Sequence, residues 1–191
     1  MKYKLLTLLL LVYSLTNAQK KTVRYNNITT IGWLNGSSQN AFTIQTINGV
    51  KINTWQLGLG VGLDNYGTKS IPIFIDARKT FGNKKWQPLV YADAGVNYTL
   101  RWGNFAVKDF NNQYYYDLNN TFYGELGVGL SKKISKKTSL NITASFSYKH
   151  LSYTEKDNNS FIFTGNSVTY TEAYQFDYYY KRLALRVGFQ F

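Results

Sequence analysis

The residue types that usually carry chemistry are sparse in this sequence. The chain of 191 residues has no cysteine and a single histidine, His150. Without cysteine there is neither thiol chemistry nor a disulfide framework. The acidic residues and the histidine form no metal-ligand cluster, the glycines form no phosphate-binding loop, and no spacing of serine, histidine and aspartate indicates a catalytic triad. The sequence therefore predicts no metal and no cofactor.

The histidine is followed two positions later by Ser152 in a segment that reads as a strand. The period of two turns both side chains to the apolar face of that strand. The pair resembles the His-x-Ser pair of the outer-membrane lipid A 3-O-deacylases. That resemblance implies His150 as base and Ser152 as nucleophile, oriented by Glu155 or Glu172. The asparagine that follows the serine in this family is replaced by Tyr153, and we interpret the histidine instead as an interfacial residue beside a loop.

A second group of residues is charged and lies in the middle of predicted strands. It contains three carboxylates and two guanidinium groups, and buried charges must be paired. The near balance predicts an interior salt-bridge network, with a gate or proton path as the alternative. The residues are Asp76, Arg78, Asp93, Glu125 and Arg186.

Alternation of apolar and polar residues with a period of two predicts eight strands. They are expected at residues 24–34, 40–47, 50–63, 71–81, 86–102, 121–131, 138–153 and from about 171 to 191. The dipeptide Asn48-Gly49 predicts a two-residue hairpin turn between the second and third strands. Long loops are expected up to about Asn120 and from Glu155 to about Tyr170.

The facing of the first expected strand stays open. Ile28 and Leu34 have one parity, whereas Ile31 and Trp33 have the other. The remaining strands have one bulky apolar face and one face of Gly, Ser, Thr, Asn and Tyr. A soluble barrel would need an outer face rich in Lys and Glu, about a quarter of its surface or more, so the apolar face is expected to point outward. Small residues suit the narrow interior of an eight-stranded barrel. The predicted fold is all-β, an eight-stranded antiparallel up-and-down transmembrane β-barrel.

The last eleven residues, Lys181 to Phe191, read KRLALRVGFQF and alternate up to the terminal aromatic. A strand this regular at the end of a chain is expected to be paired on both edges. It resembles the closing strand of the small outer-membrane β-barrel proteins of Gram-negative bacteria. The resemblance implies that Phe189 and Phe191 form a signal read by the barrel-assembly machinery.

The first 18 residues have the features of a secretory signal peptide. Lys2 and Lys4 precede the apolar run from Leu5 to Leu15, and Ala18 occupies a cleavage position. The run is shorter than the roughly 20 residues that a transmembrane helix needs. A barrel domain is therefore expected at residues 19–191, in the outer membrane.

The formal charge is +12, and the mature chain keeps 20 basic and 10 acidic side chains. The end of the barrel that holds both termini is predicted to be periplasmic and to have a basic rim without acids. The other end is predicted to be balanced, with Asp64, Lys149 and Arg182 among its charges. Anionic lipid headgroups would bind such a rim, although solvation of the turns explains it too, and export argues against nucleic acid. The rim includes Lys84, Lys85, Lys132, Lys133, Lys136 and Lys137.

Aromatic residues near the expected strand ends predict interfacial girdles. The residues are Tyr98, Trp102, Tyr148 and Tyr153. The tyrosine runs 114–116 and 178–180 could alternatively form a sugar-binding or adhesive surface. We expect a monomeric, non-enzymatic barrel whose outer loops contact lipopolysaccharide or surface partners, with the lipid-modifying enzyme as the alternative.

Overall fold

The computed structural model describes residues 23–37, 39–67, 69–100, 115–163 and 166–191. At residues 115–118 and 155–172 the description covers the backbone only. The predicted signal peptide lies outside the described residues. The described part of the chain contains no helix that is long and apolar enough to cross a membrane.

The described residues form one antiparallel sheet of nine strands. The strands are β1 (Val23–Gly36), β2 (Asn40–Ile52), β3 (Trp55–Asp64), β4 (Ser70–Thr80), β5 (Trp86–Thr99), β6 (Tyr115–Asn119), β7 (Thr121–Lys133), β8 (Ser139–Phe163) and β9 (Asn166–Gln190).

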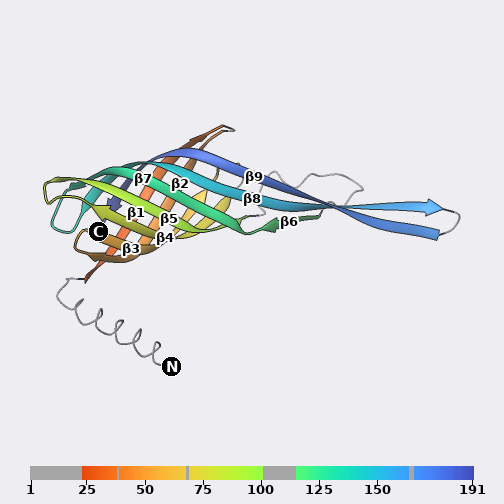
Figure 1. Cartoon of the computed structure of the whole chain (residues 1–191), viewed down its shortest axis with the longest axis horizontal. Coiled ribbons are helices and arrows are strands. Elements are labelled where there is room, and N and C mark those ends of the chain that lie inside the picture. The colour runs from red at the N-terminus through yellow and green to blue at the C-terminus, as the bar shows by residue number, and fades with distance from the viewer. Residues whose placement is uncertain (1–22, 38, 68, 101–114, 164–165) are drawn as a thin grey trace, which may run out of the picture.

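Eight of these strands close into a barrel, because β9 pairs with both β8 and β1. Strand β6 is the exception, since its only partner is β8. The predicted eight-stranded up-and-down barrel is therefore confirmed. Figure 1 shows that β1 enters the barrel at the end where the chain terminates. The connections at that end are residues 53–54, 81–85 and 134–138, none of them longer than five residues, whereas residues 37–39 and 65–69 connect strands at the opposite end.

The predicted faces of the strands are confirmed. On β3, Leu57, Leu59 and Leu63 are exposed on the outer surface, whereas Gln56 is buried in the interior. The same alternation of exposed and buried positions runs along the other barrel strands. An apolar outer surface therefore surrounds a polar interior.

The first strand, whose facing the sequence leaves open, turns Ile28 and Leu34 inward. Ile28 packs with Ile47, Phe74 and Tyr123 in an apolar layer across the lumen. A second layer lies nearer the end of the barrel opposite the C-terminus, which we call the outer mouth. It consists of Leu34, Ala41, Tyr66 and Ala184.

The hairpin turn predicted at Asn48-Gly49 is wrong. Both residues lie within β2, and the chain turns at residues 53–54, where Asn53 has a φ of 57°. Gly49 is required in the strand because a Cβ there would lie 2.0 Å from the carbonyl oxygen of Leu57. With the turn at residues 53–54, Val50 pairs with Leu57. The faces of residues 40–47 and 55–63 are still as predicted, because both turns contain two residues, but Val50, predicted to share the face of Ile47, is exposed on the outer surface.

The loop predicted between Glu155 and about Tyr170 is also wrong. Strands β8 and β9 continue through this region and stay paired as far as Phe163 and Asn166. Only residues 182–190 of β9 pair with β1, so the remainder extends past the barrel wall as a hairpin (Figure 1). The segment before Asn120, expected to be a loop, contributes β6 beside the base of this hairpin.

Candidate functional site

The five charged residues predicted for the interior come together in one cluster, which we call the inner cluster. Asp76 and Arg78 lie on β4, Asp93 on β5, Glu125 on β7 and Arg186 on β9, and each is at most 4% exposed. The three acids form a row across neighbouring strands, because Asp93 is directly opposite both Asp76 and Glu125. Like charges in such a row repel one another, so the row needs the positive charges of the two arginines.

The arginines divide the inner cluster into two ion pairs. The Nε of Arg78 donates to Oδ2 of Asp76 at 2.7 Å, and its guanidinium lies 4.4 Å from the centre of the Tyr91 ring. Arg186 binds both oxygens of Glu125, with 2.8 Å between Nη2 and Oε2. A bidentate geometry of this kind fixes both side chains.

Glu125 accepts three further hydrogen bonds from neutral groups. The hydroxyl of Tyr91 donates to it at 2.6 Å, that of Tyr123 at 2.9 Å and that of Ser145 at 2.7 Å. The side-chain amide of Gln45 in turn donates to Tyr123 at 3.1 Å. Buried carboxylates require this degree of saturation, and the network ties β2, β5, β7, β8 and β9 together across the lumen.

Asp93 differs from the other two acids of the row. Both of its carboxyl oxygens are buried and have no hydrogen-bond partner among the described residues. The inner cluster thus has one more acid than base. An unpaired buried carboxylate is costly unless a proton, a cation or water compensates it. Asp93 is therefore the group on which the predicted alternative of a proton path would depend.

A second interior network lies nearer the outer mouth, and we call it the outer cluster. Arg182 pairs with Asp64, and it donates to the hydroxyl of Ser147 at 2.8 Å. Lys149 lies 3.6 Å from the same carboxylate and donates to the Ser70 hydroxyl at 2.9 Å. All three charged side chains are buried. Our expectation that Asp64, Lys149 and Arg182 are surface charges of the outer end is wrong.

The two clusters compensate each other. The outer cluster has two bases and one acid, whereas the inner cluster has three acids and two bases. The sequence contained a signal for the outer cluster, because Arg182 shares the parity of Arg186 and Lys149 shares that of Ser145 and Ser147. Lys149 and Arg182 lie within the expected strands, so that parity already turns them inward, whereas Asp64 lies one residue beyond the expected third strand and shares the inward parity of Gln56.

Interior glycines provide the room for the large side chains. A Cβ on Gly60 would lie 2.3 Å from the Phe74 ring, and one on Gly127 would lie 2.3 Å from the Tyr91 ring. Together with the apolar layers, the two clusters fill the lumen with side chains. The interior therefore resembles a plugged barrel rather than a channel.

The structure does not arrange His150 and Ser152 as a base and a nucleophile. The Nε2 of His150 lies 2.9 Å from Oδ1 of Asp177, and its ring stacks on Tyr179 with 4.7 Å between the ring centres. Ser152 is 4% exposed, and its hydroxyl accepts 3.4 Å hydrogen bonds from the side-chain amides of Asn119 and Gln175.

The acid in this group occupies the wrong position for a proton relay. Hydrogen bonds from His150 and then from Ser152 hold the pKa of the Asp177 carboxyl below its usual value. Asp177 thus lies between the serine and the histidine, whereas a relay needs the histidine between them. The side chains of Glu155 and Glu172, either of which was predicted as the third group, lie outside the described residues.

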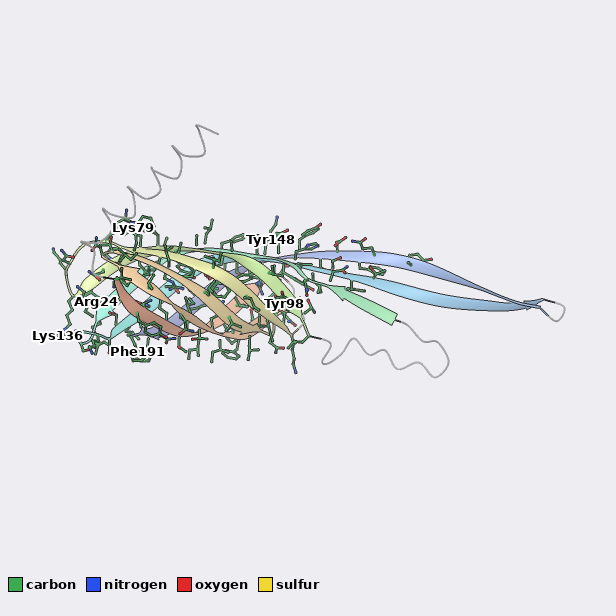
Figure 2. All side chains as sticks on the ribbon, turned by 90° about the horizontal axis from the view of Figure 1, so that it is seen from below. Arg24, Lys79, Tyr98, Lys136, Tyr148 and Phe191 are labelled. Carbon is green, nitrogen blue, oxygen red and sulfur yellow. The ribbon has the colours of Figure 1, made fainter. Side chains whose placement is uncertain are left out.

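The basic rim lies at the end of the barrel where the chain terminates (Figure 2). Figure 2 shows Arg24, Lys79, Lys136 and Phe191 gathered at this end, with Tyr98 and Tyr148 towards the other. Lys84 and Lys85 lie in the turn from β4 to β5. Lys132 and Lys133 end β7, and Lys136 and Lys137 lie in the following turn.

The C-terminal residue is tied into the barrel wall. Phe191 exchanges two backbone hydrogen bonds with Asn27, at 2.9 and 3.1 Å. Its ring is exposed on the outer surface beside that of Phe189, with 6.5 Å between the ring centres. The recognition of these two rings by the assembly machinery stays a prediction.

The residues predicted for the aromatic girdle do not all face the outer surface. Tyr98 is exposed on the outer surface, and Tyr148 has the outward parity. Tyr153 has the inward parity and stacks on Phe176 with 5.1 Å between the ring centres, so it faces the space above the lumen. Trp102 lies outside the described residues.

The second tyrosine run is split between the two faces of the outer hairpin. Tyr178 and Tyr180 continue the inward face of β9 and stack with 6.4 Å between ring centres. Tyr179 is on the opposite face, stacked between His150 and Tyr148. Of the first run, Tyr114 lies outside the described residues, and only the backbone is described for residues 115 and 116.

Comparison of the barrel with solved structures gives the same architecture. The crystal structure of Neisserial surface protein A matches with a TM-score of 0.52, covering 88% of this chain and 97% of that chain at 13% identity. This chain has the fold of the small outer-membrane β-barrels. The N-terminal β-barrel domain of Pseudomonas aeruginosa OprF is also similar, with a TM-score of 0.47 at 13% identity, covering 89% of this chain and all of that domain. Neither a protein-family model nor a curated protein sequence matches the chain.

In small outer-membrane barrels the short turns lie on the periplasmic side and the longer loops on the outside. For this chain, that arrangement predicts that the apolar outer surface faces lipid, that the basic rim is periplasmic and that the hairpin of β8 and β9 extends outward from the membrane. Within the described residues, no group of three or more His, Cys, Asp or Glu side chains could hold a metal ion.

Proposed function

We propose that this protein is a non-enzymatic outer-membrane barrel with a closed interior, which acts through its outer hairpin on surface partners. The observation that carries the proposal is the extension of β8 and β9 past the barrel wall. Strands that served only to complete the barrel would end where β1 ends.

The described part of the hairpin presents aromatic side chains on both faces. Tyr174, Phe176 and Tyr178 are exposed on the face that continues the barrel interior, and Tyr179 is exposed on the other. Exposed aromatic groups provide large contact area at low entropic cost and are enriched at interaction sites. Polysaccharide, including that of lipopolysaccharide, and surface proteins are partners that such faces suit.

The lipid-modifying alternative is not favoured by the geometry around Ser152. A serine nucleophile must be accessible and must give its proton to a base. Ser152 is covered by Asn119 of β6 and accepts hydrogen bonds from two amide groups.

The proposed contact is tested with whole cells. Cells producing the native protein and cells producing a Tyr174→Ser, Phe176→Ser and Tyr178→Ser variant are compared for retention on immobilised glycans and matrix proteins. We expect lower retention of the variant at equal surface abundance. Equal retention of both on every coated surface would contradict the proposal that the hairpin makes the contact.

A further inference from the structure

Two lysines of the periplasmic end lie directly opposite tryptophans on neighbouring strands. Lys79 of β4 pairs in register with Trp55 of β3, and Lys132 of β7 pairs with Trp86 of β5. Each ammonium group lies over its indole ring, at 4.8 Å for Lys79 and 5.0 Å for Lys132. Lys79 also lies 5.4 Å from the centre of the Phe81 ring. The same arrangement thus occurs on two separate strand pairs.

Both pairs face outward, towards lipid. Trp55 is 50% exposed and Trp86 is 46% exposed, and the lysines share the outward parity of their strands. Other cations of this end have the inward parity instead, among them Lys51 of β2 and Lys133 of β7. Tryptophan prefers the depth of the lipid headgroups. The cation–π contacts therefore hold two ammonium groups at the depth where headgroup phosphates lie.

The positive charge at these sites is not compensated by protein carboxylates. Neither Lys79 nor Lys132 forms a salt bridge with any described residue. The acids whose side chains are described belong to the two interior clusters or, in the case of Asp177, to the outer hairpin. An aromatic ring orients an ammonium group but leaves its charge in place, so each site can accept an anion.

The outer surface beside Lys79 is shaped for an apolar chain. Trp55, Ala77, Val90 and Ala92 are, with Lys79, among the residues that line a groove of the outer surface, which continues across β7, β8 and β9. Ala77 and Ala92 are directly opposite each other on β4 and β5, and their small side chains hollow the belt. A cationic group that lines an apolar groove matches a phosphate joined to an acyl chain.

We propose that Lys79 with Trp55 and Phe81, and Lys132 with Trp86, are binding sites for the phosphate group of an anionic phospholipid of the inner leaflet. At the first site an acyl chain of the lipid occupies the groove along Ala77 and Ala92. The basic residues of this end then divide into two lipid-binding lysines on the outer surface and a remainder that faces the lumen or the turns. This inference does not depend on the outer hairpin.

Native mass spectrometry of the barrel in a non-ionic detergent tests the proposal. The protein is titrated with phosphatidylglycerol and, separately, with phosphatidylcholine of the same acyl chains. We expect two molecules of phosphatidylglycerol to bind in preference to phosphatidylcholine. A Lys79→Gln and Lys132→Gln variant should bind phosphatidylglycerol about fivefold more weakly at each site, which corresponds to about 1 kcal/mol per basic residue at an anionic surface.

A matched variant removes the same charge from the inward-facing lysines. Lys51→Gln and Lys133→Gln should change the affinity less than twofold, because these side chains do not face lipid. Ala77→Leu should weaken the first site alone by filling the groove. Equal weakening by the two double variants, or equal binding of the two lipids to the native protein, would overturn the proposal. Heat-modifiable migration in gels verifies that every variant is folded.

Discussion

The buried carboxylate of Glu125 has four side-chain hydrogen-bond partners among the described residues. Its carboxylate accepts hydrogen bonds from Tyr91, Tyr123, Ser145 and Arg186. Glu125→Gln leaves the Arg186 guanidinium buried without its counter-charge. Breaking a buried ion pair from one side costs about 3 to 5 kcal/mol, and we expect a loss of that size in the free energy of unfolding, measured by urea titration in liposomes.

The double variant Glu125→Gln and Arg186→Met is the control for this prediction. Removal of both charges together is often nearly neutral, so the double variant should be more stable than the single one. If the single variant unfolds at the native urea concentration, the ion pair contributes nothing to stability.

At His150 and Ser152 the prediction is an absence of chemical effect. His150→Ala and Ser152→Ala should leave the acylation of lipid A unchanged, because Asp177 separates the two groups and Ser152 is covered. The mass profile of lipid A from cells with native or variant protein measures this. Loss of a deacylated species in either variant would restore the enzyme alternative.

The pair of His150 and Asp177 also predicts a pH response of the hairpin. Its hydrogen bonds lower the pKa of Asp177 below the ordinary value of 3.8. A carboxyl whose pKa is lowered by folding stabilises the folded state above the unfolded pKa and loses this effect as the pH falls through the folded pKa. The carboxyl carbon of Asp177 should therefore titrate below pH 3.8 in an NMR experiment. A midpoint above 4.5 would show that the contact does not form in solution.

At the scale of the elements, the sequence predicted which residues face lipid but not where every strand ends. Facing depends on alternation with a period of two along each strand, and apart from residues 50–52 it held despite the wrongly placed Asn48-Gly49 turn, because the actual turn also contains two residues. The turn itself depends on a tertiary contact, since Gly49 is needed where its strand approaches Leu57. The Asn-Gly signal cannot distinguish that requirement from a turn.

The outer hairpin could not be predicted, because its strands lack the pattern that marks the barrel wall. Residues 155–170 are mostly polar, and beyond Lys156 they are kept extended by the pairing of β8 with β9. The facing of β1 was hidden for a related reason. Its outward positions include Asn27 and Thr29, whose polar groups are satisfied by Asn48 and Thr46 of β2, so no single residue of β1 reveals the side it faces.

The closing strand β9 is anchored at its end by Phe191. Deletion of Phe191 removes two backbone hydrogen bonds to Asn27 and one lipid-facing ring. The ring should contribute about 1.5 to 3 kcal/mol at most, whereas loss of a recognition element can abolish insertion. We expect insertion in cells to fall far more than the stability of barrel refolded in detergent. Equal and mild losses in both assays would make Phe191 an ordinary belt residue.

At the scale of the whole molecule, the interior charges must be considered together. The sequence identified the inner cluster, in which acids exceed bases by one, but not the outer cluster that reverses this excess. Parity alone would have placed Lys149 and Arg182 inside. Both residues lie within the expected strands at 138–153 and about 171–191, but they were assigned to the charges of the outer end, and Asp64 lies one residue beyond the expected end of its strand.

Side chains block the lumen at two levels, so the barrel is expected not to conduct ions. The inner cluster and the outer cluster each cross the lumen, and apolar layers containing Phe74 and Tyr66 lie with them. Wide channels come from barrels of about sixteen strands, whereas eight leave room only for side chains. The purified protein should therefore show no steady large conductance in planar bilayers.

Disruption of one cluster should leave the barrel closed, because the other still fills its own level. Asp64→Asn with Arg182→Gln removes the ion pair of the outer cluster, and Glu125→Gln with Arg186→Gln removes that of the inner cluster. Each double variant should conduct no more than the native protein, and only the combination of all four changes should produce openings. Conduction by the outer-cluster variant alone would mean that the inner cluster does not seal the lumen, and the unpaired Asp93 would then lie on an open path.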